Sequence, residues 1–375
     1  MSALKKLPLH DYHQSLSAKF AAFAGWDMPL SYGSSLEEHR FVREHAGIFD
    51  VSHMGEIVVE GVQALDFLNF ALTNDLTKIK NGQAQYTLLC SEDGGTIDDL
   101  IVYKIAETKY FLCVNASNTD ADFAHLSALR GSYECEIDNQ SDDFGQLAVQ
   151  GPDSVHILSG LCGQKVTEIS RMHCMEADWL GVGKSLIART GYTGEAGFEI
   201  YCRKDQLGEW INVLSKALDS GQLRWVGLAA RDSLRLEAGF PLHGHELSDE
   251  ISPVQAGLSW AVGWDKEEFF GSSALHAEKL NIPSGRVIHY AADDRRIPRS
   301  NSLVVNLEGK KLGRVLSGGF SPLLEKPIGT AWIETSAIGE FENNGAFAEI
   351  RDKRVAISKS LPALRRVRGG YGVSS

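Results

Sequence analysis

The segment from residue 86 to residue 103 constrains the fold of this chain more than any other part of the sequence. Two apolar β-type runs, over residues 86–90 and 100–103, enclose a turn that contains Glu92, Asp93 and two glycines. This arrangement is typical of an antiparallel hairpin. Antiparallel hairpins mixed with helices favour an α+β fold over a doubly wound parallel sheet.

Helical and strand-like patterns alternate through the first part of the chain. The expected helices cover residues 35–49, 62–76, 118–129 and 207–218, and the expected strands cover residues 56–60, 110–114, 185–188 and 198–201. A serine precedes the first of these helices in a capping position. Residues 11–32 are expected to form an entry segment with a strand-like patch and a turn that closes at residues 26–29.

The texture of the sequence changes after Trp264. Short β-rich pieces follow at residues 287–290, 303–305, 312–316, 328–333 and 347–350, separated by Gly and Asn turns. Such spacing is typical of a small β-barrel or sandwich. We therefore expect a domain boundary near Ile282, with an α+β region of two intertwined lobes over residues 1–281 and a β-barrel domain over residues 282–375.

Composition limits the classes of function. A length of 375 residues with 43% hydrophobic and 23% charged residues suits a globular protein of two or three domains. The net charge of −12 argues against nucleic acid as the main ligand, because phosphate binding needs a basic face. No stretch approaches the roughly 20 apolar residues that span a bilayer.

The six cysteines contain no CxxC pair and no disulfide or zinc spacing. We expect reduced, mostly buried thiols in a cytosolic compartment. The first 13 residues hold no apolar run long enough for a signal peptide.

Three suggestive motifs do not support a site. Residues 181–185 resemble the end of a phosphate-binding loop, but the pattern requires a glycine where Asp178 stands, and no GxGxxG motif follows a strand. His243 and His245 have no third metal ligand marked in the sequence, so no metal is expected. His53 is interpreted as a packed or capping residue.

Asp98 and Asp99 form the most conspicuous acidic pair, directly before the apolar run 100–103. Neighbouring side chains of a strand point to opposite faces, so only one of the two can face a given pocket. A carboxylate among apolar residues must be hydrogen-bonded or take part in function. The pattern alone favours the interpretation that both acids cap or close the hairpin.

Two further clusters contain candidate ligand-binding residues. Three glycines between Thr190 and Glu199 predict a tight loop that a ligand can approach, and a buried Glu199 could accept two hydrogen bonds from a fused ring. The alternative is an acid on the exposed face of a strand. Arg231 and Arg235 lie one turn apart on a predicted helix and could bind a carboxylate or form intrahelical ion pairs.

Taken together, these segments resemble the glycine cleavage T-protein, or aminomethyltransferase, family. The resemblance runs in family order through PLHDYH, FAGWDMPLSY, FDVSHMG, QYTLLCSEDGGTIDDLIVYK, TGYTGEAGFEIY, GLAARDSLRLEAGFPLHGHELSDEISPVQAGLSWAV and SGGFSPLLEKPIGTAWI. It implies a three-lobed fold around a folate pocket, with a C-terminal β-barrel as the last lobe. It also implies transfer of a one-carbon unit from the aminomethyl-lipoyl arm of the carrier H-protein to tetrahydrofolate, with release of ammonia.

The resemblance assigns site residues by position. Asp99 matches the catalytic aspartate, and the folate-contacting positions are Met54, Tyr86, Asn115, Tyr192, Glu199, Arg231 and Arg368. The tail around Arg368 departs from the family's pattern, as do Ala196, Ala229 and His243, and these departures bear on substrate preference. The alternatives are a folate-dependent demethylase and a non-catalytic folate-binding protein, although the latter branch carries a KGCYxGQE motif that is absent here.

Overall fold

The computed structural model describes residues 3–179, 181, 183–351 and 353–368. The chain forms two compact units. The first comprises Met1–Leu89 and Asp98–Arg231, and the second comprises Cys90–Ile97 and Asp232–Ser375. The tip of the predicted hairpin therefore belongs to the second unit, while both of its strands continue into the first. Ile282 lies inside the second unit, shortly before the first strand of a barrel.

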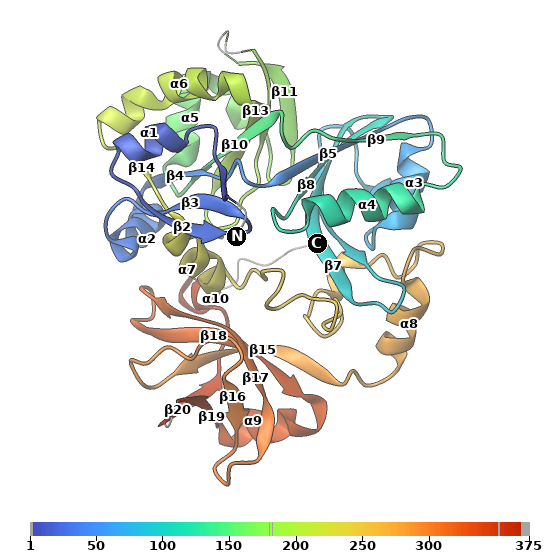
Figure 1. Cartoon of the computed structure of the whole chain (residues 1–375), viewed down its shortest axis with the longest axis vertical. Helices are drawn as coiled ribbons and strands as arrows, with labels where there is room; N and C mark the ends of the chain where they lie inside the picture. The colour runs from blue at the N-terminus through green and yellow to red at the C-terminus, as the bar shows by residue number, and fades with distance from the viewer. Residues whose placement is uncertain (1–2, 180, 182, 352, 369–375) are drawn as a thin grey trace. The chain divides into compact units, whose positions relative to one another are not determined.

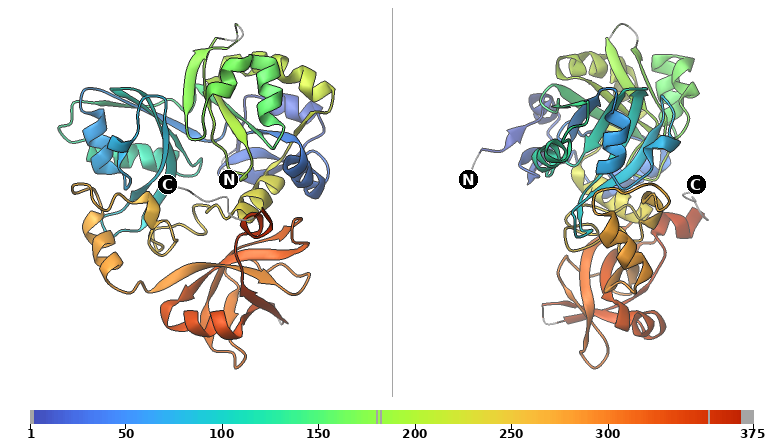
Figure 2. Two further views of the ribbon diagram at one scale, coloured as in Figure 1. Left: turned by 180° about the vertical axis from the view of Figure 1, so that it is seen from behind. Right: turned by 90° about the vertical axis from the view of Figure 1, so that its right-hand side faces the viewer.

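A six-stranded sheet organises one part of the first unit. Its order is β11 (Cys174–Asp178), β12 (Lys184–Ala188), β13 (Gly197–Arg203), β10 (Phe144–Gln150), β4 (Ala46–Asp50) and β14 (Leu223–Trp225). Helices α5 (Ser154–Cys162) and α6 (Leu207–Asp219) cover one face (Figure 1), and the view from behind shows the same layer (Figure 2). Trp210 and Leu214 of α6 are fully buried against this sheet. The helix is stabilised by burial of this apolar face.

A five-stranded sheet organises the other part of the first unit. Its order is β6 (Ala84–Cys90), β7 (Thr96–Ala106), β8 (Lys109–Val114), β5 (Gly55–Glu60) and β9 (Glu136–Asn139), accompanied by helices α3 (Ala64–Ala71) and α4 (Thr119–Leu129). Tyr103 and Phe111 of this sheet pack against Tyr201 of the six-stranded sheet in one buried cluster. The two sheets thus share an interior within this unit.

The N-terminal segment differs from its expected structure. It contains helix α1 (His10–Ser15) and a three-stranded sheet of order β1 (Lys5–Lys6), β3 (Trp26–Ser31) and β2 (Lys19–Phe23). The expected turn at residues 26–29 is wrong, because those residues belong to β3. The turn lies just before them, where Ala24 and Gly25 both have positive φ.

The helix expected over residues 35–49 is only partly right. Helix α2 (Ser35–Glu44) begins after Ser34, whose side chain accepts the backbone N–H of Glu37, but residues 46–50 form strand β4. All five residues of β4 are buried between β10 and β14. A run buried on both faces suits a central strand rather than an amphipathic helix. The helix expected over residues 62–76 is also shorter, because Leu72 forms a bridge with Leu89 after α3 ends.

The second unit contains a closed barrel rather than a sandwich. Its strands, in order around the barrel, are β15 (Gly285–Ala292), β18 (Lys326–Glu334), β17 (Lys311–Ser321), β16 (Leu303–Val305), β19 (Ala346–Ile350) and β20 (Lys353–Lys359). The sequence did not predict β20, which closes the barrel by pairing with β15 and β19. The remaining helices are α7 (Leu228–Ala238), which begins in the first unit, α8 (Ser272–Leu280), α9 (Ile338–Asn344) and α10 (Ala363–Arg368).

Two general expectations can be compared with the described residues. The six cysteines are free and buried, as predicted. Among the described residues, no helix combines the length and apolar character needed to cross a membrane. The α+β class with a C-terminal barrel is confirmed, since the six-stranded and five-stranded sheets of the first unit, with their helices, and the barrel of the second account for the lobes expected from the resemblance.

Phe341 offers a direct test of the barrel core. Its side chain is fully buried in α9 among barrel residues, so Phe341→Ala removes apolar contacts and leaves a cavity. The expected loss in free energy of unfolding is about 3–5 kcal/mol, measured by urea denaturation. Leu307→Ala is the matched control, because Leu307 is 73% exposed, and its effect should stay within about 0.5 kcal/mol. Equal losses in the two variants would contradict this assignment of the core.

Candidate active site

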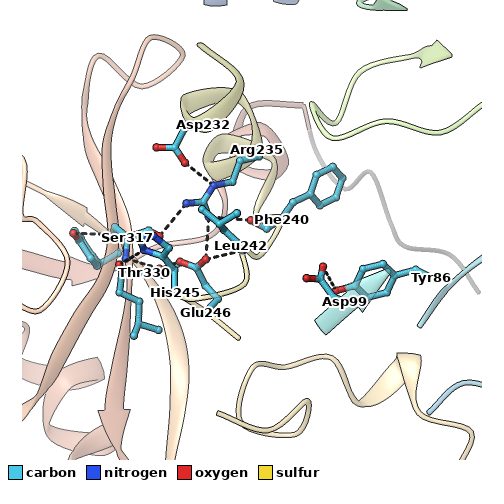
Figure 3. A network of polar contacts seen from close by, with 12 residues as sticks. Tyr86, Asp99, Asp232, Arg235, Phe240, Leu242, His245, Glu246, Ser317 and Thr330 are labelled. Carbon is cyan, nitrogen blue, oxygen red and sulfur yellow. Dashed lines mark hydrogen bonds and ion pairs between the residues drawn. The ribbon is translucent and has the colours of Figure 1, made fainter. Parts of the chain in front are cut away.

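Asp99 lies on β7 with both carboxylate oxygens engaged. Tyr86 on β6 donates its hydroxyl to Asp99 Oδ2 over 2.9 Å, and the Asn115 side-chain amide donates to Asp99 Oδ1 over 3.0 Å. Figure 3 shows the Tyr86–Asp99 contact. Asp99 is partly exposed to solvent, whereas Asp98 is fully buried. The two acids therefore differ in environment, as the alternation of a strand requires.

Asp98 fixes the segment that joins β8 to α4. Its Oδ2 accepts the backbone N–H of Asn115 over 2.9 Å, and its Oδ1 accepts the side-chain amides of Asn115 and Asn118 over 2.8 and 2.7 Å. These three hydrogen bonds fix the orientation of the buried carboxylate. Asp98 thus orients Asn115, and Asn115 in turn contacts Asp99. Neither acid merely closes the hairpin.

Burial and the neighbouring charge of Asp98 raise the pKa of Asp99 to about 7, while hydrogen bonds from Tyr86 and Asn115 act in the opposite direction. Burial and the charge of Asp99 also raise the pKa of Tyr86 well above its ordinary value, so Tyr86 stays a hydrogen-bond donor. A carboxyl group with a pKa near neutrality can accept or release a proton at physiological pH. Asp99 therefore has the electrostatic properties of an acid–base group.

Glu199 lies buried on β13 in a second polar cluster. Gln146 on β10 donates its amide to Glu199 Oε1 over 3.0 Å, and the Thr190 hydroxyl donates to Oε2. Burial raises the pKa of Glu199, and the Thr190 hydrogen bond and the charge of Arg231 partly offset this rise. A carboxylate has about four acceptor positions, so two protein donors leave capacity for a ligand.

Tyr192 and Arg231 join these two clusters. The Arg231 guanidinium carbon lies 4.6 Å from the centroid of the Tyr192 ring, which is within cation–π range. The charge of Arg231 acts on Glu199, and Tyr192 acts electrostatically on Tyr86. The contacts pair Asp99 with Tyr86 and Tyr192 with Arg231, and all five residues, Glu199 included, belong to the first unit.

His53 is buried beside this neighbourhood. Burial and the charge of Arg231 lower the pKa of His53 to about 3, so its imidazole is neutral. Within the described residues, His53 Nδ1 has no hydrogen-bond partner. Met54, the next residue, is partly buried and packs against the cluster that contains Tyr103 and Tyr201. An unused buried nitrogen beside an arginine and an aromatic ring is suited to contact a ligand.

Several residues of this site were missed in the sequence. Gln146 and Thr190 hold Glu199, and Asn118 holds Asp98. Thr190 opens the glycine-rich motif but was given no role, and the signal for Asn118 was the Asn115-x-x-Asn118 spacing directly after a strand. Arg368 ends α10, and its side chain lies outside the described part of the chain.

A separate polar network lies in the second unit (Figure 3). Arg235, 2% exposed, donates to Glu246 Oε2 over 3.0 Å and to the Ser317 hydroxyl over 3.0 Å. The Thr330 hydroxyl donates to the other oxygen of Glu246. Burial opposes ionisation of Glu246, but the charge of Arg235 outweighs it and lowers the pKa of Glu246. This network links α7 and the loop after it to barrel strands β17 and β18.

His243 and His245 contact backbone carbonyls in the second unit. His243 Nε2 lies 3.1 Å from Thr96 O, and His245 Nδ1 lies 2.8 Å from Leu316 O. These contacts hold the loop after α7. In the part of the chain that the structure describes, no group of three or more His, Cys, Asp or Glu side chains could hold a metal ion.

Comparison with known proteins decides the family. The GCVT N-terminal domain matches residues 9–266, and the glycine cleavage T-protein C-terminal barrel domain matches residues 286–364. The chain belongs to the glycine cleavage T-protein family. An aminomethyltransferase of Geobacillus kaustophilus is 43% identical over 97% of this chain and 100% of its own length. One of Thermoanaerobacter pseudethanolicus is 42% identical over 89% and 91%.

A solved structure of this family agrees in fold. The glycine cleavage system aminomethyltransferase T of Bartonella henselae has a TM-score of 0.89 and 38% identity, covering 96% of this chain and 98% of its own. The chain is therefore an aminomethyltransferase by family. The resemblance found in the sequence is confirmed for the family and fold, and the roles of individual site residues remain proposals.

Tyr86→Phe tests the electrostatics of Asp99. The Tyr86 hydrogen bond lowers the pKa of Asp99, so its removal raises that pKa, and the ionised form then needs a higher pH. The acid limb of the kcat/KM profile should move upward by about one pH unit. The control is Tyr110→Phe, since the buried Tyr110 hydroxyl has no hydrogen-bond partner among the described residues. A limb that stays in place in Tyr86→Phe would refute the role of this hydrogen bond.

Proposed function

We propose that this chain transfers the one-carbon unit of an aminomethyl group, carried on the dihydrolipoyl arm of the H-protein of the glycine cleavage system, to tetrahydrofolate. Ammonia leaves, and the reduced arm remains on the carrier. The observation that carries this proposal is the carboxylate of Asp99 held between Tyr86 and Asn115, in surroundings that raise its pKa to about 7. Family membership supports the same reaction class.

The proposed reaction needs two proton transfers. In the carrier, the carbon is bonded to one sulfur and one amino nitrogen, and both bonds must break. Two folate nitrogens each form a bond to the carbon and each lose a proton. One proton goes to the departing ammonia and the other to the departing sulfur. The carbon passes through an iminium-like cation, so the site must stabilise positive charge and accept protons.

Asp99 suits both tasks. Its carboxylate can accept a hydrogen bond from a folate N–H and can stabilise a nearby cation. Tyr86 and Asn115 hold both of its oxygens, so its orientation is set before substrates bind. Positioning of two bound reactants supplies much of the acceleration in reactions of this kind.

Glu199, Tyr192 and Arg231 suit the pterin side of the substrate. Glu199 has acceptor capacity for the amino and N–H groups of a pterin, and the Tyr192 ring beside Arg231 offers a flat surface for a fused ring. Met54 and the unpaired His53 Nδ1 border this neighbourhood and suit its lining. Arg368 is retained as a proposed contact by resemblance alone.

Tetrahydrofolate and the lipoylated H-protein are the proposed partners, and neither nucleic acid nor a membrane is required. We propose a cytoplasmic location, which agrees with six free buried cysteines and with bacterial relatives. A domain boundary near Ile282 stays part of the proposal. It falls between the two family matches, which end at residue 266 and begin again at residue 286.

A folate-dependent demethylase is the second candidate, because the same pocket could accept a methyl group. The assay uses carrier protein loaded with the aminomethyl group and tetrahydrofolate. Ammonia and methylene-tetrahydrofolate are the expected products. Formation of 5-methyl-tetrahydrofolate from a methyl donor, without ammonia, would instead favour the demethylase, and folate binding with no turnover of either substrate would favour a binding protein.

Asp99→Asn tests the catalytic assignment. The amide preserves shape but cannot accept a proton, so turnover should fall about 100-fold or more while tetrahydrofolate still binds. Turnover is measured as ammonia release and binding by fluorescence titration. Asp98→Asn is the neighbouring comparison, and its loss of turnover per folded molecule should be smaller because Asp98 contacts only the supporting segment. A larger loss in Asp98→Asn would exchange the two roles.

Glu199→Gln tests the pterin assignment. Replacement of a charged acceptor by a neutral amide should weaken tetrahydrofolate binding about tenfold or more, measured by calorimetry. Glu209→Gln on the exposed face of α6 is the control, and its affinity should match that of the wild type. Unchanged affinity in Glu199→Gln would remove this residue from the proposed site.

A further inference from the structure

Asp122 lies behind the proposed catalytic carboxylate, on helix α4. Asn118 caps this helix, and Asp122 follows it by four residues, so both side chains lie on one helical face. The Asn118 amide donates to Asp98 Oδ1 over 2.7 Å. The side chain of Asp122 is fully buried. The same face of α4 therefore presents an amide and a carboxyl group to Asp98.

The carboxyl group of Asp122 is unusual because neither of its oxygens has a hydrogen-bond donor within the described residues. In contrast, Asp98 accepts three N–H groups from Asn115 and Asn118. Burial raises the pKa of Asp122, and the charge of Asp98, a hydrogen bond with Asp98 and the charge of Asp99 raise it further. His125, one turn later on α4, has its pKa lowered by burial, so it supplies no cation.

Two carboxylates in contact without a cation do not both ionise, because each charge raises the cost of the other. The N-terminus of α4 favours a negative charge, but this effect is smaller than the cost of burying a second unpaired carboxylate. The hydrogen-bond pattern decides which acid keeps the proton. Asp98 accepts three N–H groups and has one acceptor position left, whereas Asp122 has no donor, so the proton belongs on Asp122.

We propose that Asp122 retains a proton in the resting protein and donates it to Asp98, so that the pair carries a single negative charge and positions Asp99 through Asn115. The chain of contacts runs from Asp122 to Asp98, from Asp98 to Asn115 and from Asn115 to Asp99. Asp122 is thus a positioning residue. The expected effect of Asp122 on turnover rests on the proposed function and the role of Asp99 in it. The protonation of Asp122 is independent of that function.

This arrangement limits the charge near Asp99. The groups that face Asp99 are Asp98, Tyr86 and Asn115, and Tyr192 acts on Tyr86. With Asp122 neutral, Asp98 alone supplies a neighbouring negative charge. A second ionised acid would hold Asp99 protonated to higher pH and remove the carboxylate that the proposed reaction uses.

Asp122→Asn is the decisive variant, because an amide reproduces the shape and the donor of a neutral acid but cannot ionise. Infrared difference spectra between wild type and variant near neutral pH should show the carbonyl band of one protonated carboxylic acid, present only in the wild type. The acid limb of the kcat/KM profile should stay in place. Absence of that band would overturn the proposal. So would a limb lowered by about half a pH unit or more, because it would mean that the substitution had removed a charge.

Asp122→Leu removes the donor and keeps the volume. Asp98 then loses a hydrogen bond and holds Asn115 less firmly. Because the hydrogen bond from Asn115 lowers the pKa of Asp99, its weakening should move the acid limb to higher pH and lower kcat several-fold, while KM for tetrahydrofolate changes little. Asp122→Asn should restore both values. Asp120→Asn, on the exposed side of the same turn, is the control and should leave every measurement unchanged. Identical pH profiles in the Leu and Asn variants would overturn the positioning role.

The infrared result keeps the two proposals separable. Suppose that the wild type shows no aminomethyl transfer but has an acid band that Asp122→Asn loses. The missing transfer would contradict the proposed function, and the band would still support the protonation of Asp122. If Asp122→Leu does not fold, the infrared and pH measurements on Asp122→Asn still decide the proposal.

Discussion

The contact between the side-chain amide of Asn115 and the carboxylates of Asp98 and Asp99 is the interaction on which the site depends. Asp98 holds the backbone and the side chain of Asn115, and Asn115 holds Asp99. Asp98 and Asp99 are consecutive on β7, and the single side-chain amide of Asn115 reaches both carboxylates. Asp98 anchors the start of α4, and Asp99 is the carboxylate proposed to meet the substrates.

Burial of acids is the common electrostatic feature of the first unit. Asp98, Asp122, Glu199 and Glu56 are all buried, and burial alone raises the pKa of Glu56 well above its ordinary value. Glu56 lies on β5 opposite Cys113, and neither of its carboxylate oxygens has a donor among the described residues. A buried acid without a cation costs stability unless it is neutral or well hydrogen-bonded. In the first unit, these buried acids therefore lower the stability of the fold unless they are neutral or hydrogen-bonded.

In the second unit, a buried arginine is paired with a buried glutamate. Its barrel has an apolar core, and the buried side chains of Arg235 and Glu246 form an ion pair. Hydrogen bonds from Ser317 and Thr330 complete this pair. A saturated ion pair holds α7 and the following loop to the barrel without creating a group that titrates near neutral pH. This difference supports the proposal that proton transfer takes place in the first unit.

The sequence by itself determined the hairpin at residues 86–103, the α+β class, the barrel strands other than β20 and the family, because each depends on local patterns or on the order of motifs. The tertiary structure alone decided that residues 46–50 form a central strand and which hydrogen-bond partners Asp98 and Asp99 have. It also showed that Gln146, 53 residues away from Glu199, holds that carboxylate. Hydrogen bonds between such distant residues depend on which strands become neighbours, and a linear pattern does not specify that. The protonation of Asp122 likewise follows from burial and from missing donors, which exist only once the chain has folded.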